Sequence, residues 1–276
     1  MDSTSGNEMY RSIEYIRKHT NYDTNLIWDY ILRHFHIADI YTVLGLSFVV
    51  SEQQNNIAKS IMNRVVVIVS IKNTSQLDFI RSRLCCVPEE ANIVIISEDS
   101  YEIKELLKER QKIEIVSFSD GGKDFISMMK TILSYIEIYD YICLLPLHNE
   151  DDDYVNNSLE QRELIWDNLL VNQQYVLNII SILEEHPRMG VAFPPVPIYG
   201  PYMDNIFDRW HHSFEAVKTV CQQLGIHVPL AKEKQPIMLG EAFWCRRQVL
   251  LPFAKGLITQ TSHIRNKPSI GRSIVA

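Results

Sequence analysis

Between residues 64 and 147 the sequence alternates between short apolar runs and helical patterns. The apolar runs are bounded by polar residues and read RVVVIVSI, NIVIISED, KIEIVSFSD and YDYICLLPL. Runs of this length and composition are typical of strands that are buried on both faces. The intervening segments, SQLDFIRSRLC, SYEIKELLKERQ and GKDFISMMKTILSYI, carry apolar residues at helical spacing. This alternation predicts an α/β fold with a Rossmann-type, mostly parallel sheet flanked by helices.

The residues before this region follow a different pattern. EMYRSIEYIRKH and TNLIWDYILRHFHIADIYTVLGL have amphipathic helical spacing, with Thr24 as the expected N-cap of the second helix. The polar segment SEQQNNIAKSIMN then predicts a linker. We therefore expect an N-terminal helical appendage with its linker over residues 1–60, and one α/β domain over residues 61–276.

After residue 147 the pattern is less regular. LIWDNLLVNQQYVLNIISILEEHP predicts a long helix or a helix pair, and MGVAFPPVPIYGPY a strand that breaks into a proline-rich loop. FDRWHHSFEAVKTVCQQLGI predicts a further helix, with Gly225 as its C-cap. PIMLGEAFWCRRQVLLPF predicts a short strand or loop followed by a helix.

Composition excludes several classes of protein. The chain has 276 residues, of which 46% are hydrophobic, and a net charge of -7 that argues against a nucleic-acid partner. Its five cysteines include no CxxC pair, and its polar N-terminus is no signal peptide, as expected for a cytoplasmic protein with reduced thiols. No GxGxxG or GxxxxGK[ST] motif is present, which argues against a nicotinamide cofactor and a P-loop. Peripheral association with the inner face of a membrane stays compatible with this composition.

Ligands of parallel α/β sheets bind at the carboxyl ends of the strands. Ser70 and Ser97 end the first two predicted strands and are therefore candidates for contact with a nucleotide. The third strand runs into SDGGKD, which opens a helix and contains Gly121, Gly122, Lys123 and Asp124. Glycines allow close approach, and a helix N-terminus attracts an anion such as a diphosphate. A tight turn with an acidic residue at the helix start explains the same residues and stays open.

The fourth strand ends in LHNEDDD, a histidine followed by carboxylates. His148, Glu150 and Asp151 are candidate ligands of Mg²⁺ or Mn²⁺, hard cations that favour oxygen ligands and bridge diphosphates. A solvated acidic loop explains this composition equally and stays open. Further along, Gly240 permits close approach, and Trp244 offers an aromatic face for a sugar.

The order of these motifs resembles the rhamnan synthesis protein F family of bacterial cell-wall polysaccharide glycosyltransferases. The resemblance covers residues 20–255 and rests on TNYDTNLIWDYILRHFHIADIYTVLGLSFVV, GGKDFISMMK, YDYICLLPLHNED, HPRMGVAFPPVPIYGPY and LGEAFWCRRQVLLPF. Gly122 and Asp124 match a Gly-Arg-Asp motif, and His148 matches the histidine that ends the central strand. The late segment is matched by Gly240, Phe243, Trp244 and Arg246.

The resemblance implies a GT-A-like glycosyltransferase domain. Such a domain would move a sugar, with rhamnose as the first candidate, from a nucleotide-diphosphate donor such as dTDP-rhamnose to a cell-wall or surface polysaccharide. The expected partners are the donor, a glycan acceptor and membrane-bound polysaccharide machinery. Asp124 and His148 are candidate catalytic residues, and Glu241 is a candidate carboxylate base by its location.

This sequence departs from the family pattern at three places. Lys123 stands where an arginine is usual, and Asn149 and Glu150 follow His148 where Asp or Thr and then lysine are usual, so an acidic loop would need a metal to bind a diphosphate. The family also continues into Asp-Gly-Thr and His-Ala-x-Glu-Arg segments, and we read this chain as C-terminally incomplete. Two alternatives stay open, a non-catalytic sugar-binding or assembly module and a nucleotide-sugar-modifying enzyme.

Overall fold

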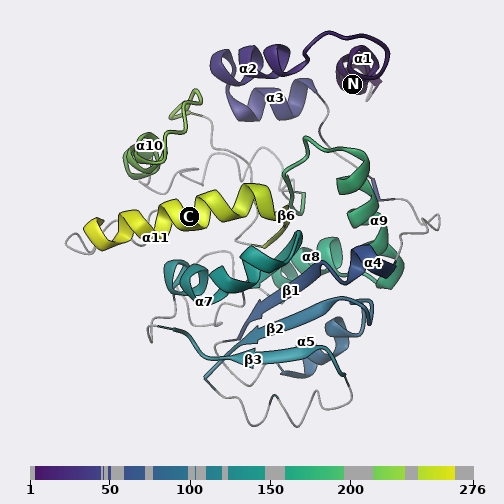
Figure 1. Cartoon of the computed structure of the whole chain (residues 1–276), viewed down its shortest axis with the longest axis vertical. Helices are drawn as coiled ribbons and strands as arrows, with labels where there is room; N and C mark the ends of the chain where they lie inside the picture. The colour runs from purple at the N-terminus through teal and green to yellow at the C-terminus, as the bar shows by residue number, and fades with distance from the viewer. Residues whose placement is uncertain are drawn as a thin grey trace. The chain divides into compact units, whose positions relative to one another are not determined.

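The structure of the chain is a computed structural model (Figure 1). The chain divides into two compact units. The first unit comprises Met1–Val49, Val196–Ile237 and Asn266–Ala276, and the second comprises Val50–Pro195 and Met238–Arg265. The structure describes residues 4–44, 46, 49–50, 59–71, 77–98, 103, 110–119, 124–146, 159–195, 214–233 and 242–264.

The first unit is helical in its described parts. Its helices are α1 (Thr4–His19), α2 (Asn25–His34), α3 (Ile37–Val43) and α10 (Phe214–Gln223). The predicted helix after Thr24 is split in two, because Phe35 adopts an extended conformation between α2 and α3. Thr24 does occupy the N-cap position of α2, but its side chain makes no capping bond; instead Asp23 Oδ1 accepts from the backbone N–H of Asn25 over 2.9 Å.

Gly225 ends α10 as the sequence predicts. Its φ of 68° lies in the left-handed region, which favours glycine. The N–H of Gly225 donates to Gln222 O over 3.1 Å, and that of Ile226 donates to Cys221 O over 2.8 Å. This pair of bonds is a Schellman motif, and it satisfies carbonyls that the helix end would otherwise leave open.

The second unit is built on a six-stranded sheet with the order β3-β2-β1-β4-β6-β5. Its strands are β1 (Val65–Ser70), β2 (Asn92–Ile96), β3 (Ile113–Val116), β4 (Tyr141–Pro146), β5 (Val191–Ala192) and β6 (Phe243–Arg246). The first four strands are mutually parallel, and β6 runs antiparallel to both β4 and β5. The prediction of a mostly parallel α/β sheet is therefore confirmed.

Helices cover both faces of this sheet. They are α4 (Lys59–Met62), α5 (Leu77–Leu84), α7 (Phe125–Ile138), α8 (Leu159–Leu169), α9 (Gln173–Glu185) and α11 (Arg247–Ile264). The β1–β2 and β3–β4 connections cross the sheet in opposite directions, so right-handed crossovers place α5 and α7 on opposite faces. Between β2 and β3 the structure describes residues 97–98, the helical Ile103 and residues 110–112, so the predicted helix there lies largely outside the described residues.

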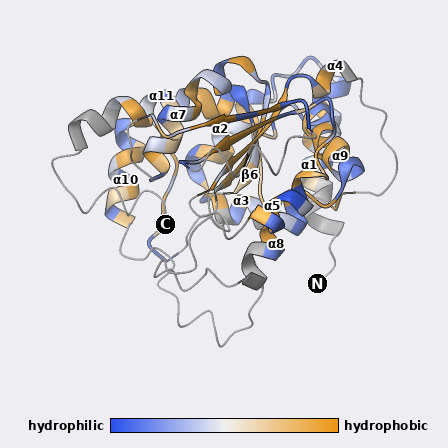
Figure 2. Ribbon diagram, turned by 90° about the horizontal axis from the view of Figure 1, so that it is seen from below, coloured by the Kyte–Doolittle hydropathy of each residue, from blue (hydrophilic) through white to orange (hydrophobic). Residues whose placement is uncertain are grey.

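The core follows from the alternation of side chains along fully buried strands. In β1, Val65, Val67 and Val69 share one apolar cluster with residues of α5, α8 and α9. The intervening Val66 and Ile68 point to the opposite face and are equally buried. On that face α7 and α11 pack side by side (Figure 1). The strands accordingly form the hydrophobic centre of the unit (Figure 2).

The segment after β4 is a helix pair rather than one long helix. Helices α8 and α9 are separated by a short turn, and Asn172 caps α9 by accepting from the N–H of Tyr175 over 2.8 Å. Trp166 of α8 is buried and meets Phe79 of α5 edge-on, with ring centroids 5.3 Å apart. The pairing of α8 with α5 therefore closes the first face of the sheet.

Candidate functional site

Ser70 and Ser97, two of the predicted site residues, lie at the carboxyl edge of the parallel strands. Ser70, the last residue of β1, lies opposite Ile96 of β2 and Pro146 of β4. Strand order reverses between β1 and β4, since β1 leads to β2 on one side and β3 leads back to β4 on the other. This reversal is the place where open α/β sheets bind ligands outside the carboxyl ends.

Ser70 and Ser97 bring two small polar side chains to this edge. Both are buried, with exposed fractions of 4% and 2%. The backbone hydrogen bonds between the strands continue past the ends of β1 and β2. Ile71 N–H donates to Ile96 O over 2.8 Å, and Ser97 N–H donates to Val116 O over 2.9 Å. The sequence prediction that the two serines lie on neighbouring strand ends agrees with this register.

Strand β6 enters the sheet at the same edge. It runs antiparallel to β4 with Phe243 opposite Leu144, so its amino end lies beside the carboxyl end of β4. Ala242, the residue before the strand, is buried. Gly240 and Glu241 directly precede this point in the sequence and lie outside the described residues. The topology thus brings segments that are distant in sequence to one edge.

The segment after β3 is attached to helix α7 on both sides. The N–H of Ser119 donates to Thr131 Oγ1 over 3.0 Å, and the N–H of Ser127 donates to Asp124 Oδ1 over 2.7 Å. Residues 120–123 lie between these two attachments. Gly121, Gly122 and Lys123 therefore belong to a stretch outside the described residues whose two flanks are both fixed.

Asp124 is the N-cap of α7. Its backbone is extended, with φ -93° and ψ 172°, and its carboxylate bonds the N–H of Ser127. Capping by aspartate typically contributes about 1 kcal/mol, and the negative charge suits the positive end of the helix dipole. The alternative interpretation of Asp124, an acidic residue at the start of a helix, therefore agrees with the structure. Contact of the exposed carboxylate with a ligand stays a prediction.

Trp244 is a core residue in this structure. Its exposed fraction is 0%, and its indole N–H donates to Leu169 O over 3.1 Å. Phe243 is buried as well. A sugar needs an accessible aromatic face on which to stack, and Trp244 presents none. The stacking role predicted for Trp244 is therefore corrected to packing between β6 and α8.

Arg246 lies at the opposite edge of the sheet from Ser70. It pairs with Tyr141, which itself pairs with Val65, and Ser70 lies five residues further along β1. At ~3.3 Å per residue this register separates Arg246 from the carboxyl edge by ~17 Å along the strand direction. Contact of Arg246 with substrate stays a prediction, and in this structure the guanidinium is bonded to carbonyls at the end of α9.

A family model for rhamnan synthesis protein F matches residues 2–275. The chain belongs to this family. The match confirms the resemblance that the sequence motifs indicate, and it extends over almost the whole chain. It ties the rhamnan synthesis protein F chain to polysaccharide synthesis. A search of curated proteins finds no match.

Among the described helices, none is long and apolar enough to cross a bilayer. Within the described ranges no three His, Cys, Asp or Glu side chains come together as metal ligands. The predicted ligands His148, Glu150 and Asp151 all lie outside those ranges, so they stay predictions.

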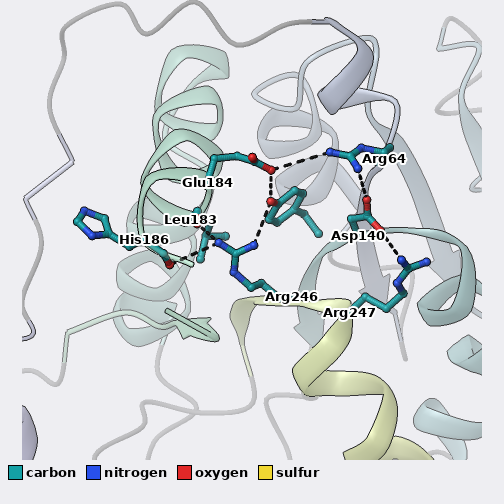
Figure 3. Close-up of polar contacts among 8 residues, drawn as sticks. Arg64, Asp140, Leu183, Glu184, His186, Arg246 and Arg247 are labelled. Carbon is teal, nitrogen blue, oxygen red and sulfur yellow. Dashed lines mark hydrogen bonds and ion pairs between the residues drawn. The ribbon is translucent and has the colours of Figure 1, made fainter. Parts of the chain in front are cut away.

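Sequence reasoning did not find a polar network at the amino edge of this family member's sheet (Figure 3). Asp140, just before β4, bridges Arg64 over 2.5 Å and Arg247 over 2.9 Å. Backbone bonds reinforce the same junction, since Arg247 N–H donates to Asp140 O over 2.8 Å and Asp140 N–H to Arg64 O over 2.9 Å. Arg64 and Asp140 precede β1 and β4, and Arg247 follows β6, so these contacts hold the three strands in register at this edge.

Tyr141 joins this network to helix α9. Its hydroxyl bonds Glu184 and accepts from Arg246 Nη1 over 3.2 Å, while the Arg246 guanidinium lies over its ring at 5.5 Å. The pKa of Tyr141 is raised to about 12, chiefly by burial and to a lesser extent by the bond to Glu184. The sequence does show a tyrosine at the start of β4 and an arginine at the end of β6. It does not show their partners, because the residues of α9 that they contact are distant in sequence.

Thr131 is a further residue that the sequence analysis missed. It stands in helix α7 between Met129 and Ile132, which are both fully buried. A hydroxyl next to buried apolar positions was the available signal. Its bond to the N–H of Ser119 adds a contact between the end of β3 and α7.

Proposed function

We propose that this chain is a GT-A-like glycosyltransferase domain that moves a sugar from a nucleotide-diphosphate donor to a cell-wall or surface polysaccharide. The family match supports a role in polysaccharide synthesis. Rhamnose is the first candidate for the sugar, and dTDP-rhamnose for the donor. The single observation that carries the proposal is the strand register, which brings Ser70, Ser97 and the starts of α7 and β6 to one edge.

The nucleotide would lie across the ends of β1 and β2. The hydroxyls of Ser70 and Ser97 are small enough to let a flat base or a ribose approach the strand ends. The diphosphate would then lie toward the segment that precedes α7, where Gly121 and Gly122 allow close approach and Lys123 supplies positive charge. A positive environment stabilises the diphosphate as it leaves the sugar.

A divalent cation is part of the proposal. His148, Glu150 and Asp151 follow β4, whose end lies opposite Ser70. Two carboxylates and an imidazole suit Mn²⁺, and the carboxylates alone suit Mg²⁺. When bound, the cation would offset the negative charge of the diphosphate. The three side chains would hold the cation, and its charge would allow the acidic segment to bind an anionic donor.

The acceptor would approach from the side on which β6 begins. Glu241 directly precedes Ala242, and β6 enters the sheet beside the end of β4. An inverting transfer needs a carboxylate that takes the proton of the acceptor hydroxyl as the new bond forms. Glu241 is the proposed base on grounds of position. The glycan acceptor would be delivered by membrane-bound polysaccharide machinery.

The second candidate is a non-catalytic sugar-binding or assembly module. It is favoured by one observation, the acidic sequence Asn149–Asp153 where a lysine is usual in the family. Such a module would bind a glycan without turnover and without a need for metal. The two candidates therefore differ in their dependence on a nucleotide and on Mn²⁺.

Calorimetric titration tests the proposal directly. The chain is titrated with nucleoside diphosphates and nucleotide sugars, including dTDP-rhamnose, with and without Mn²⁺. Selective binding of one nucleotide that strengthens with Mn²⁺ would support the transferase. A folded sample that binds a glycan but no nucleotide would support the module instead. His148→Ala should weaken nucleotide binding, and an unchanged affinity would remove His148 from the site.

Asp124 requires a variant that separates capping from ligand contact. Asp124→Ala removes the cap, so lost binding would be ambiguous. Asn is as good an N-cap as Asp but carries no charge. If the carboxylate contacts the donor, Asp124→Asn should keep its melting temperature and lose affinity. If Asp124 acts only as a cap, Asp124→Asn should bind like the unmodified chain and Asp124→Ala should be less stable.

A further inference from the structure

Two cysteines are adjacent in the turn that follows helix α5. The helix ends at Leu84, and the backbone N–H of Cys86 donates to Arg83 O over 3.0 Å, which closes the turn. Cys85 is exposed, and Cys86 is half-buried against the apolar core. Both are free thiols. One thiol is therefore open to reagents in solution, and the second follows it directly in the chain.

Each thiol makes its own weak hydrogen bond. Cys85 Sγ donates to Ser82 O, three residues earlier in α5, over 2.8 Å, and Cys86 Sγ donates to Val171 O over 3.2 Å. The two thiols also interact with each other, because burial raises the pKa of Cys86 and the neighbouring Cys85 raises it further. An S–H group is a weak donor, so the sulfur atoms can leave their acceptors and turn toward each other.

The cysteine pair contacts the turn between α8 and α9 in two ways. Val171 lies in this turn, next to the fully buried Leu170. The side-chain amide of Gln173, at the start of α9, donates to Cys85 O over 3.3 Å. The thiol of Cys86 and the carbonyl of Cys85 therefore both bond the same turn. Both bonds depend on the geometry of the peptide unit between the two cysteines.

The segment after the cysteines is held more firmly. The guanidinium of Arg110 donates to Val87 O over 2.8 Å and to Pro88 O over 2.6 Å. A hydrogen bond from a charged donor is roughly twice as strong as a neutral one. A movement of the cysteine pair should therefore break the contact with Val171 before it breaks the contacts with Arg110.

We propose that Cys85 and Cys86 form a reversible redox switch, in which a low-molecular-weight disulfide oxidises them to a vicinal disulfide and thereby releases the α8–α9 turn. The exposed Cys85 thiolate attacks one sulfur of the small disulfide, which forms a mixed disulfide and releases one thiolate. Cys86 then attacks Cys85 Sγ, which closes the protein disulfide and releases the second thiolate. Two electrons pass from the cysteine pair to the small disulfide, and the two thiol protons end on the released thiols.

The resulting bond is strained, and the strain makes it reversible. Neighbouring Cα atoms lie ~3.8 Å apart across a trans peptide bond, whereas disulfides usually join Cα atoms ~4.4–6.8 Å apart. The turn must therefore distort when the bond closes, and Cys86 Sγ loses the proton that it donates to Val171 O. Strained disulfides are reduced more easily than unstrained ones, so a thiol reductant restores the reduced turn. These properties suit a sensor rather than a structural crosslink.

Serine variants separate the two steps, because a hydroxyl keeps each hydrogen bond but cannot form a disulfide. The full chain is treated with oxidised glutathione at about pH 8, where a thiol is partly ionised. Remaining thiols are alkylated before digestion with trypsin. Cleavage after Arg83 and Lys104 gives one peptide that contains Cys85 and Cys86 but no other cysteine. Cys221→Ser, at a half-buried cysteine of α10, is the matched control.

In the unmodified chain, this peptide should lose the mass of two hydrogen atoms and regain it with dithiothreitol. The oxidised chain should melt about 2–4 °C lower than the reduced chain, as expected for one lost hydrogen bond in a protein of this size. Cys86→Ser should stop at the mixed disulfide and carry glutathione on Cys85, whereas Cys85→Ser should stay reduced at this peptide. Cys221→Ser should behave like the unmodified chain.

Two results would overturn the inference. If the peptide of the unmodified chain stays reduced, or keeps glutathione on Cys85, the two cysteines do not close a disulfide. If the oxidised chain melts at the same temperature as the reduced chain, the α8–α9 turn does not respond and the pair is no switch. These measurements use no nucleotide and no sugar, so they decide the inference independently of the proposed transferase.

Discussion

The indole N–H of Trp244 donates a hydrogen bond to the carbonyl of Leu169 over 3.1 Å inside the apolar core. Leu169 is the last residue of α8, and Trp244 lies in the middle of β6. One side chain therefore fills the space between helix and sheet and also satisfies a carbonyl at a helix end. Substitutions at Trp244 should consequently act on stability before they act on ligand binding.

Trp244→Phe should lower the free energy of unfolding by about 1–3 kcal/mol, because the Leu169 carbonyl loses its buried partner. Urea unfolding measures the change. Trp166→Phe serves as the control for packing, since it makes a substitution of the same size in the same core. The folded variant should keep its donor affinity. Full stability combined with lost donor affinity would instead return the indole to the ligand site.

Arg246→Met should be destabilised by about 2–4 kcal/mol. The guanidinium donates to the carbonyls of Met189, Leu183 and His186, so its removal leaves several polar groups at the end of α9 without a charged donor. Arg246→Lys should recover only part of this, because an ammonium cannot reproduce the planar fork. Chemical denaturation measures both variants. A stable Arg246→Met that loses donor binding would contradict the structural role.

Tyr141 should make the chain less stable in alkali. Its folded pKa is raised from 10.0 to about 12, so the folded state retains a proton that the unfolded state releases above pH 10. The contribution is complete below pH 10 and is lost as pH rises through about 12. The stability difference between the unmodified chain and Tyr141→Phe should shrink over this window. Urea unfolding at several pH values checks it, and parallel curves for the two proteins would refute the assignment.

Gly190→Ala should destabilise the contact between the start of β5 and α11. A Cβ at this position would lie 2.7 Å from Val249 Cγ2, so the valine side chain must move. Overpacking of this kind costs about 1–3 kcal/mol. Val249→Ala in the same chain should relieve the clash, so the double variant should be more stable than the sum of the two single changes predicts. Strict additivity would show that the two positions do not interact.

Strands β1, β2 and β4 were predictable because each is buried on both faces. Such strands leave uninterrupted apolar runs, and β1 and β2 begin and end within three residues of the predicted runs. The same local signal is weak for β6, which has four residues and obtains its stability from pairing with β4. The break between α2 and α3 at Phe35 could not be predicted either, because the apolar residues keep their helical spacing across it.

The candidate site shows why neighbouring residues in sequence need not share a function. Phe243 and Arg246 are three residues apart, yet Phe243 lies opposite Leu144, toward the carboxyl end of β4, and Arg246 lies opposite Tyr141 at its start. A motif that contains both residues cannot place them in one site. Ser70 and Ser97 were predictable for the converse reason, since the ends of parallel neighbours coincide by geometry.

Strands β5 and β6 are adjacent and antiparallel, with Ala192 opposite Trp244. In topological terms they form a hairpin, and the connection between its strands, residues 193–242, contains α10. Lengthening a loop is inexpensive, about 0.6 kcal/mol for each doubling. The sheet therefore tolerates a long insertion at this point, and the inserted residues can diverge in sequence while the register beneath them stays the same.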